Sequence, residues 1–188
     1  TNKKGKQMKI TIVVGGRWHA FNLAEKLEEE ECLHRLITCY PLWYVRKWNI
    51  PKDKIKSLPL QFYLTKLSYK IGGHWLAMKL QWPLHQLFAQ RAKRYLTGSE
   101  LIHCWAQFAK PSLEWARVHN IPTVLERSSS HILEQKEVLE KEAEKHRVKI
   151  SLTSKKIINM ELEEYELCNS IAVPSSYVEE TFIKRGIS

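Results

Sequence analysis

The sequence predicts an α/β fold: a Rossmann-like doubly wound parallel sheet with helices on both faces, plus a basic and aromatic helical insertion. Three observations favour it. Short β-branched apolar runs alternate with segments of helical periodicity. The first run, KITIVV at residues 9–14, is typical of a strand buried on both faces of a parallel sheet. A glycine pair, Gly15 and Gly16, separates this run from the first helical pattern.

The opening segment predicts a βαβ unit. The strand at residues 9–14 is followed by residues 18–30, in which apolar side chains recur at the spacing of one helix face. Residues 34–40, HRLITCY, then predict a second strand. Two strands joined by a helix in this way pair in parallel.

The middle of the chain, residues 41–100, differs in composition from both flanks and is interpreted as an insertion. Residues 41–57 predict an irregular basic loop that two prolines interrupt. Residues 60–71 and 75–96 predict two helices joined by the pair Gly72–Gly73. A proline inside the second of these helices predicts a kink or a new start.

The alternation of strand and helix resumes after residue 100. The expected elements are a strand at 101–106, a helix at 111–119, a strand at 121–126, helices at 132–148 and 155–168, a strand at 170–175 and a helix at 175–186. The last helix has Ser175 as its N-cap and a glycine at its end. In doubly wound sheets, ligands bind beyond the carboxyl ends of the strands. Functional residues are therefore expected directly after the strands.

The excess positive charge lies in one segment. The chain has 30 basic and 20 acidic residues, which gives a net charge of +10. Residues 40–95 hold eleven of the basic residues and one acid, Asp53, and the remaining nineteen of each sign cancel. Four tryptophans lie in the same segment: Trp43, Trp48, Trp75 and Trp82. One region is therefore suited to an anionic partner, while the rest of the chain is electrically neutral.

Three interpretations of residues 40–95 remain open on composition. The segment can lie on an anionic membrane surface, with its tryptophans in the interface and Lys66, Lys70 and Lys79 on the headgroups. It can bind nucleic acid, because lysines and arginines with interleaved aromatic residues also suit phosphates and bases. It can also consist of ordinary core helices with solvated basic faces.

Several classes of site are not predicted. The four cysteines lie far apart with no C-x-x-C pair, which favours free buried thiols in a reducing, cytoplasmic setting over a zinc or disulfide framework. No Ser-His-Asp order, H-E-x-x-H motif or Cys/His ligand cluster occurs, so no metal site is expected. No apolar run is long enough to span a membrane, and the first residues lack the apolar region of a signal peptide.

The glycine pair has two explanations. Glycines between a strand and a helix let the backbone approach a ligand closely, and the N-terminus of the helix favours an anion there. The spacing G-x-G-x-x-G is absent and no G-K-[ST] follows, so neither a dinucleotide fingerprint nor a P-loop is present. A tight turn that binds no ligand explains the pair equally well.

Three stretches together resemble the N-terminal domain of GT-B glycosyltransferases. They are the glycine loop followed by AFNLAEKL, the segment HCWAQFAKPSLEWARVHNIPTVLERSSSH and the segment MELEEYELCNSIAVPSSYVEETFIKRGIS. The likeness is to the retaining, nucleotide-sugar-using group often called family four, and it covers residues 8–40 and 101–188. Residues 41–100 match no motif of that group. The chain has Ser128 where that group typically has a glycine.

The resemblance implies roles for the matching residues. The loop expected to face the donor diphosphate consists of Gly15, Gly16 and Arg17. The cleft that binds the acceptor is expected to contain His103, Glu126, Arg127, Ser129 and His131. The candidates for a catalytic role are His131, Arg127 and His19. No cofactor is implied, because the nucleotide-sugar is a substrate.

The resemblance also implies partners and a location. Such an enzyme moves a sugar from a nucleotide-sugar donor to a lipid-linked or polysaccharide acceptor, and is expected in the cytoplasm, peripheral to the inner face of the membrane. In this group the donor site, with its paired-glutamate motif, lies mainly in a second domain, which would follow Ser188. These 188 residues are therefore expected to be inactive alone. The alternative is a Rossmann-like module that binds nucleic acid through residues 40–95.

Overall fold

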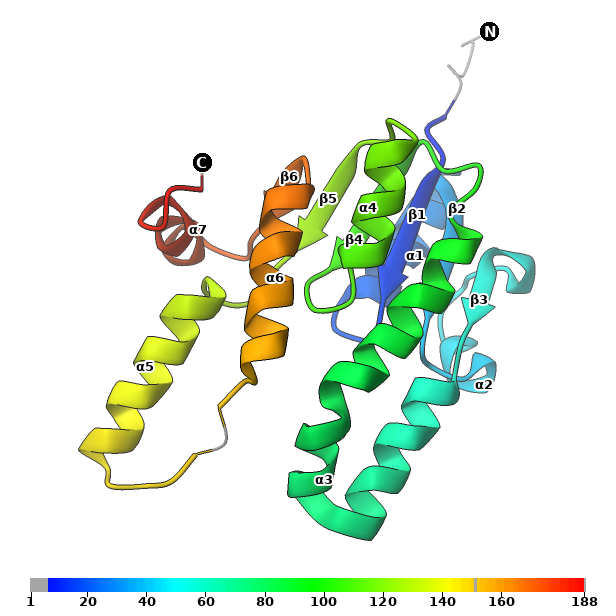
Figure 1. Ribbon diagram of the computed structural model, residues 1–188. Helices are drawn as coiled ribbons and strands as arrows, with labels where there is room; N and C mark the ends of the chain where they lie inside the picture. Colours follow the sequence, from blue (N-terminus) through cyan, green and yellow to red (C-terminus); the bar gives the residue numbers. More distant parts are fainter. Residues whose placement is uncertain (1–6, 151, 188) are drawn as a thin grey trace, which may run out of the picture.

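The computed structural model describes residues 7–150 and 152–187. In this part of the chain six strands form one sheet in the order β3-β2-β1-β4-β5-β6, and every neighbouring pair is parallel. The strands are β1 (Ile10–Val14), β2 (Leu33–Thr38), β3 (Ile55–Ser57), β4 (Leu101–Trp105), β5 (Thr123–Glu126) and β6 (Ser170–Ala172). The strand order reverses between β1 and β4, which is the switch point of the sheet. The predicted doubly wound α/β fold is confirmed (Figure 1).

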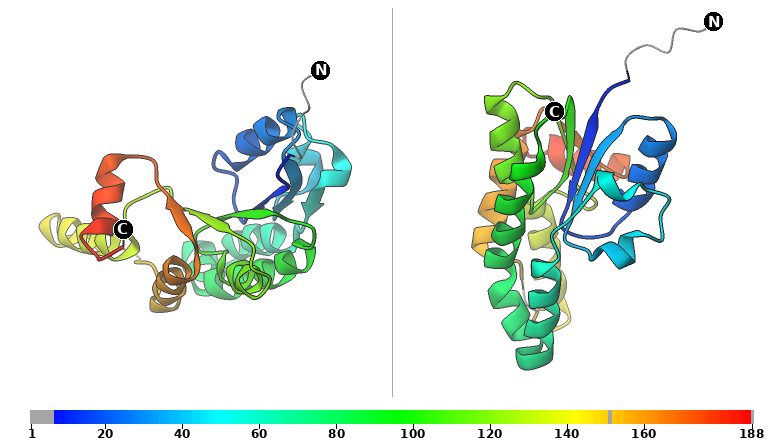
Figure 2. Two further views of the ribbon diagram at one scale, coloured as in Figure 1. Left: turned by 90° about the horizontal axis from the view of Figure 1, so that it is seen from above. Right: turned by 90° about the vertical axis from the view of Figure 1, so that its right-hand side faces the viewer.

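Helices cover both faces of the sheet (Figure 2). They are α1 (Ala20–Glu29), α2 (Leu42–Val45), α3 (Leu60–Ala92), α4 (Lys110–Val118), α5 (Ile132–Lys145), α6 (Lys155–Leu167) and α7 (Ser176–Ile183). Side chains of β1 alternate between two cores, as the pleat of a strand requires. Ile12 and Val14 belong to the core that α1 and α2 cover. Val13 belongs to the core that α3, α4 and α6 cover.

The expectation of an irregular loop over residues 41–57 is wrong. The segment contains α2, a 3₁₀ turn at Lys52–Lys54 and the edge strand β3. In β3, Ile55 pairs with Leu36 of β2 and is buried. A single apolar residue between two lysines cannot show the alternating pattern of a strand. This strand therefore forms because β2 offers it a parallel partner. Lys56 on this edge hinders pairing with a further chain.

The helix α3 consists of two arms that meet at Gly73. This residue has φ 58° and ψ −154°, angles that are essentially restricted to glycine. Figure 1 shows the arms running back alongside each other, and residues of both arms line one pocket. The predicted pair of helices joined by Gly72–Gly73 is therefore confirmed, and Pro83 lies within the second arm. We call residues 60–72 the first arm and residues 74–92 the second arm.

Two further findings concern the length of the apolar helices and the state of the cysteines. Among the described residues, no helix is long and apolar enough to cross a membrane. All four cysteines are described and all are free thiols. Cys39 and Cys104 are buried, whereas Cys32 and Cys168 are partly exposed.

Candidate functional site

The carboxyl edge of the sheet holds most of the residues that the sequence predicted as functional. The loop after β1 carries residues 15–19, β4 ends at Trp105, and β5 ends at Glu126. Because β1 and β4 are neighbours across the switch point and β5 lies next to β4, the ends of all three strands lie close together. This edge is where doubly wound sheets bind their ligands.

At this edge Glu126 joins two histidines. Its Oε1 lies 3.3 Å from Nε2 of His19, and its Oε2 lies 3.2 Å from Nε2 of His103. The indole of Trp105 contacts both imidazoles, with ring centroids 5.5 Å from His19 and 4.9 Å from His103. We call Glu126, His19 and His103 the His–Glu–His cluster. The sequence predicted each of the three residues, but not their mutual contact.

The His–Glu–His cluster is enclosed on one side and open on the other. The side chains of Glu126 and His103 are 10% and 15% exposed, whereas that of His19 is 57% exposed. A carboxylate that accepts from Nε2 of a neutral imidazole leaves Nδ1 as the proton acceptor. His19 can therefore accept a hydrogen bond or a proton from a ligand, while Glu126 fixes the orientation of its ring. The arrangement suits general acid–base chemistry or the binding of a hydroxyl group.

Close packing of aromatic rings explains the glycine pair after β1. A Cβ atom on Gly15 would lie 2.3 Å from the ring of Phe108, and one on Gly16 would lie 2.2 Å from the ring of Trp18. Phe108 is 5% exposed, whereas Trp18 is 47% exposed and has more room to move. The loop is therefore pressed against the segment that follows β4. Its expected contact with a donor diphosphate stays a prediction.

Arg17 extends from the same loop into solvent. Its Nη1 donates a hydrogen bond of 3.2 Å to the hydroxyl of Tyr44 in α2. The guanidinium is thus anchored at one corner, and the residue is exposed. Such a group can pair with a phosphate oxygen, as expected for this position.

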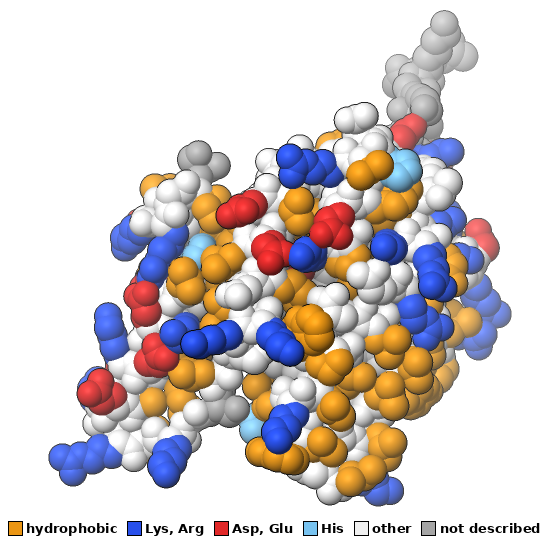
Figure 3. Space-filling view, viewed as in Figure 1, with side chains coloured by type: hydrophobic (Ala, Val, Ile, Leu, Met, Phe, Trp, Pro, Cys, Tyr) orange, Lys and Arg blue, Asp and Glu red, His pale blue; other side chains and the backbone are white. Residues whose placement is uncertain are grey.

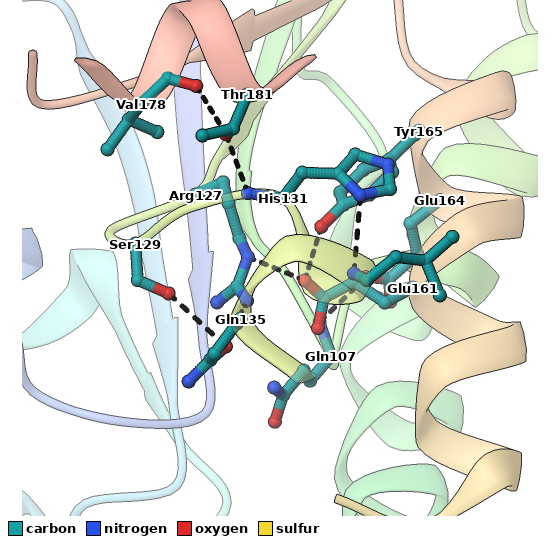
Figure 4. A network of polar contacts seen from close by, with 11 residues as sticks. Gln107, Arg127, Ser129, His131, Gln135, Glu161, Glu164, Tyr165, Val178 and Thr181 are labelled. Atoms are coloured by element: carbon teal, nitrogen blue, oxygen red, sulfur yellow. Dashed lines mark hydrogen bonds and ion pairs between the residues drawn. The ribbon is translucent and has the colours of Figure 1, made fainter. Parts of the chain in front are cut away.

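Arg127 takes part in a buried ionic network (Figure 4). Its Nε lies 2.6 Å from Oε1 of Glu161, and the same oxygen accepts a hydrogen bond of 2.5 Å from the hydroxyl of Tyr165. Its Nη2 donates to Oε1 of Gln135 at 2.7 Å, and the hydroxyl of Ser129 donates to that oxygen at 3.4 Å. Arg127 is 7% exposed. In this structure it joins β5, α5 and α6 and presents almost no surface to a ligand.

His131 is buried as well, at 1% exposure. Its Nδ1 accepts a hydrogen bond of 3.3 Å from the amide of Leu133, which caps α5, and its own amide donates to Thr181 at 3.0 Å. Burial lowers the pKa of His131 to about 4, and the nearby charges of Arg185 and Arg127 act in the same direction. The ring is therefore neutral near pH 7. The contact with a substrate that the resemblance implies for Arg127 and His131 stays a prediction.

A residue that the sequence did not place in the site, Glu164 of α6, holds the segment after β4. Its carboxylate accepts three backbone hydrogen bonds of 2.7–3.0 Å, from the amides of Gln107, Ala109 and Lys110. Burial raises the pKa of Glu164 to about 8, although the three amide donors favour the ionised form. The partners are main-chain atoms, so no side-chain pattern in the sequence could have shown this contact.

A pocket of about 380 Å³ lies between the arms of α3 and the carboxyl edge of the sheet. Its lining includes Gly15 and Gly16 at the sheet, Phe62 of the first arm, and Leu84 and His85 of the second arm. No member of the His–Glu–His cluster lines it. No sequence pattern predicted this pocket, because its two helical walls match no motif and are joined by the turn at Gly73.

The residues predicted for a membrane surface fall into two groups. Trp43 and Trp75 are 60% and 64% exposed, whereas Trp48 and Trp82 are partly buried. Trp48 packs against Phe21 of α1 with ring centroids 5.0 Å apart. The three predicted lysines, Lys66, Lys70 and Lys79, are exposed. Figure 3 shows hydrophobic side chains gathered over α3 with lysines or arginines among them.

Among the described residues, no group of three or more histidine, cysteine, aspartate or glutamate side chains is placed to hold a metal ion. No protein-family model matches the chain, and no curated protein matches it. The chemistry of the site therefore has to be inferred from the geometry of its own residues.

Proposed function

We propose that this chain is the acceptor-side half of a GT-B glycosyltransferase of family-four type, and that the carboxyl edge of its sheet forms one wall of the reaction cleft. The observation that carries the proposal is the contact of Glu126 with His19 and His103 at the switch point. Burying a carboxylate costs free energy unless it is paired. Three polar side chains held together at a ligand-binding edge therefore indicate a chemical task there.

Each member of the cluster has a distinct role in this proposal. His19, with its exposed ring, contacts a hydroxyl group of the sugar or of the acceptor. Glu126 fixes the tautomer and the orientation of His19, and His103 holds the second oxygen of Glu126. Arg17 offers positive charge to the leaving diphosphate, which stabilises the charge that develops as the bond to the sugar breaks. The donor itself is bound mainly by a second domain.

The first test measures sugar transfer by the full-length protein that the gene encodes. Labelled nucleotide-sugars are supplied with lipid-linked and polysaccharide acceptors, and Glu126→Gln is compared with Glu180→Gln. Glu180 is an exposed glutamate on α7 and is the matched control. Loss of a positioned polar group lowers turnover by about ten- to thousand-fold. Such a fall in turnover is expected for Glu126→Gln and not for Glu180→Gln.

Two results would contradict the proposal. Equal turnover of Glu126→Gln and Glu180→Gln would remove the His–Glu–His cluster from the reaction. Sugar transfer by the 188-residue chain on its own would show that the chain is not half of an enzyme. The full-length protein should also lose turnover with His19→Ala, because the exposed imidazole is the contact with substrate.

The turn of α3 carries a second part of the proposal, association with an anionic membrane. Along the first arm and at this turn several large apolar side chains are exposed, namely Tyr63, Leu67, Tyr69, Ile71 and Trp75. Lysines lie among them, and the Nζ of Lys79 lies 3.8 Å from the ring centroid of Trp75. Apolar side chains beside cations match the interface of an anionic bilayer, where each basic residue contributes about 1 kcal/mol.

Vesicle binding tests this part. The protein should co-sediment with phosphatidylglycerol vesicles and not with phosphatidylcholine vesicles, and salt should weaken the binding because exposed charges are screened over about 8–10 Å. Trp75→Ala should weaken it further, whereas Val118→Ala, an exposed apolar residue on α4, should not. Equal sedimentation with both lipids contradicts the proposal. Binding to a single-stranded oligonucleotide without vesicle binding would instead favour the nucleic-acid alternative.

A further inference from the structure

Three residues that line the pocket between the arms of α3 carry unpartnered hydrogen-bond acceptors. Each has a buried side-chain atom with no hydrogen-bond partner: Oε1 of Gln61, Oε1 of Gln81 and Nδ1 of His85. Gln61 and His85 are 5% and 8% exposed. Buried polar side-chain atoms are nearly always paired in folded proteins, so three unpaired acceptors in one pocket call for donors from a bound molecule.

His85 is a neutral acceptor in this position. Its ring packs on Phe108 with centroids 4.2 Å apart and forms a hydrogen bond with the backbone of Gln107. Burial lowers the pKa of His85 to about 4, so the imidazole carries no charge near pH 7. With one ring nitrogen engaged by the backbone, Nδ1 offers a lone pair to the pocket.

The remaining lining defines what else the occupant must be. The walls are largely apolar and aromatic: Tyr40, Phe62, Tyr69, Ala77, Met78, Leu84 and Phe108. Lys66 also lines the pocket, with its Nζ 4.4 Å from the ring centroid of Phe62, and its side chain is exposed. A phosphate or carboxylate only accepts hydrogen bonds and would face three acceptors there. The lining therefore favours an occupant that donates several hydrogen bonds and fits against apolar walls.

We propose that this pocket binds a neutral polyhydroxylated unit, such as a monosaccharide, whose O–H groups donate to Gln61, Gln81 and His85. Hydroxyl groups both donate and accept, so they pair with either end of a glutamine amide. The C–H faces of a sugar ring pack against Phe62 and Phe108. Gly15 and Gly16 line the pocket, so a unit held there lies next to the loop after β1. Its role as part of the acceptor rests on the proposed function, whereas the binding itself does not.

The test measures binding to the 188-residue chain directly. Glucose, galactose, mannose, N-acetylglucosamine and glycerol are titrated at millimolar concentrations, with glucose 6-phosphate and inorganic phosphate as anionic comparators. Backbone amide chemical shifts are followed by NMR. At least one neutral sugar should shift amides of the pocket lining, including Gly15 and Phe62, while inorganic phosphate should not. Absence of any such shift with every neutral sugar overturns the proposal.

Gln81→Leu separates a binding role from a structural one. Removing an unpaired buried acceptor should raise the melting temperature of the free protein by about 2–4 °C and weaken sugar binding about tenfold. Gln90→Leu is the matched control, because Gln90 is exposed on the same arm and lies outside the pocket. His85→Phe gives a second variant with the same expectation for binding.

The outcomes distinguish this proposal from the proposed function. Equal sugar binding by Gln81→Leu and Gln90→Leu overturns the pocket assignment. A gain in stability without sugar binding by the unmodified chain assigns the pocket to buried water and also overturns it. Sugar binding that depends on Gln81, in a full-length protein that transfers no sugar, leaves the pocket standing and contradicts only the glycosyltransferase proposal.

Discussion

Replacing Gly15 with alanine tests whether packing explains the glycine after β1. The added Cβ would lie 2.3 Å from two carbons of the Phe108 ring, whereas carbon atoms in contact are about 3.5–4.0 Å apart. The ring or the loop must therefore move by more than about 1 Å. The ring of Phe108 is held by His85 and by Phe88, with centroids 4.2 and 5.9 Å away. Neither neighbour is exposed, so the ring can yield only toward the pocket that it lines.

Overpacking of this kind costs about 1–3 kcal/mol of unfolding free energy. For a chain of this length each kcal/mol lowers the melting temperature by about 2–4 °C, so Gly15→Ala should melt about 2–12 °C below the unmodified protein. Gly16→Ala is the matched control. Its Cβ would approach Trp18 just as closely, but Trp18 is 47% exposed and can turn into solvent. Its cost should stay within about 0.5 kcal/mol.

Thermal unfolding followed by circular dichroism, supported by urea titration, measures both variants. Phe108→Leu in the Gly15→Ala background should recover part of the loss relative to the sum of the single changes, because residues in contact couple by about 0.5–3 kcal/mol. Equal stability of Gly15→Ala and Gly16→Ala would refute the packing explanation. The glycine pair would then serve a ligand, or it would have no role that affects the stability of the protein.

Three further predictions concern buried charge and titration. Glu161→Leu removes the carboxylate that pairs with the buried Arg127 and should cost about 3–5 kcal/mol in urea unfolding, so a loss below about 1 kcal/mol would contradict the buried pair. His85 and His131 have pKa values lowered from about 6.5 to about 4, so the unfolded chain binds protons first as the pH falls. The unfolding free energy should therefore fall between about pH 6.5 and pH 4, by about 3 kcal/mol for each histidine, and a flat acid limb in urea titrations would count against this. The pKa shift of Glu164 has the opposite effect on stability. Its pKa is raised to about 8, so its contribution to the unfolding free energy is present at low pH and is lost as the pH rises from about 4.5 to about 8. Glu164→Gln should flatten this slope, and an unchanged slope would assign it to other groups.

The sequence predicted most of the fold because local patterns coincide with the elements. Ser175 caps α7 as expected, with its Oγ accepting from the amide of Val178 at 3.4 Å. The break at Gly72–Gly73 predicted the turn between the arms of α3, and Gly73 takes a conformation that requires glycine. The edge strand β3 was not predicted because Ile55 is its single buried residue.

The candidate site could be predicted only in part. Strand ends placed His103 and Glu126 at the same edge, because β4 and β5 are consecutive strands. Their actual contact depends on the register that pairs His103 with Val124 and Trp105 with Glu126, which the pattern does not encode. The same limit applies to Gln61 and Gln81, which line one pocket only because the two helical arms fold back on the sheet.

The pairing of β1 with β4 allows the α3 hairpin to vary in length. Ile10 pairs with Leu101, so the whole α3 hairpin lies in the loop that this pairing closes. The entropy of closing a loop grows slowly with length, by about 0.6 kcal/mol for each doubling. Adding or deleting whole turns at the Gly72–Gly73 end would therefore leave the sheet nearly as stable. The end of the hairpin can therefore vary in length while Phe88 and Ala92 keep its base in the core, and the depth of the pocket can change without a new fold.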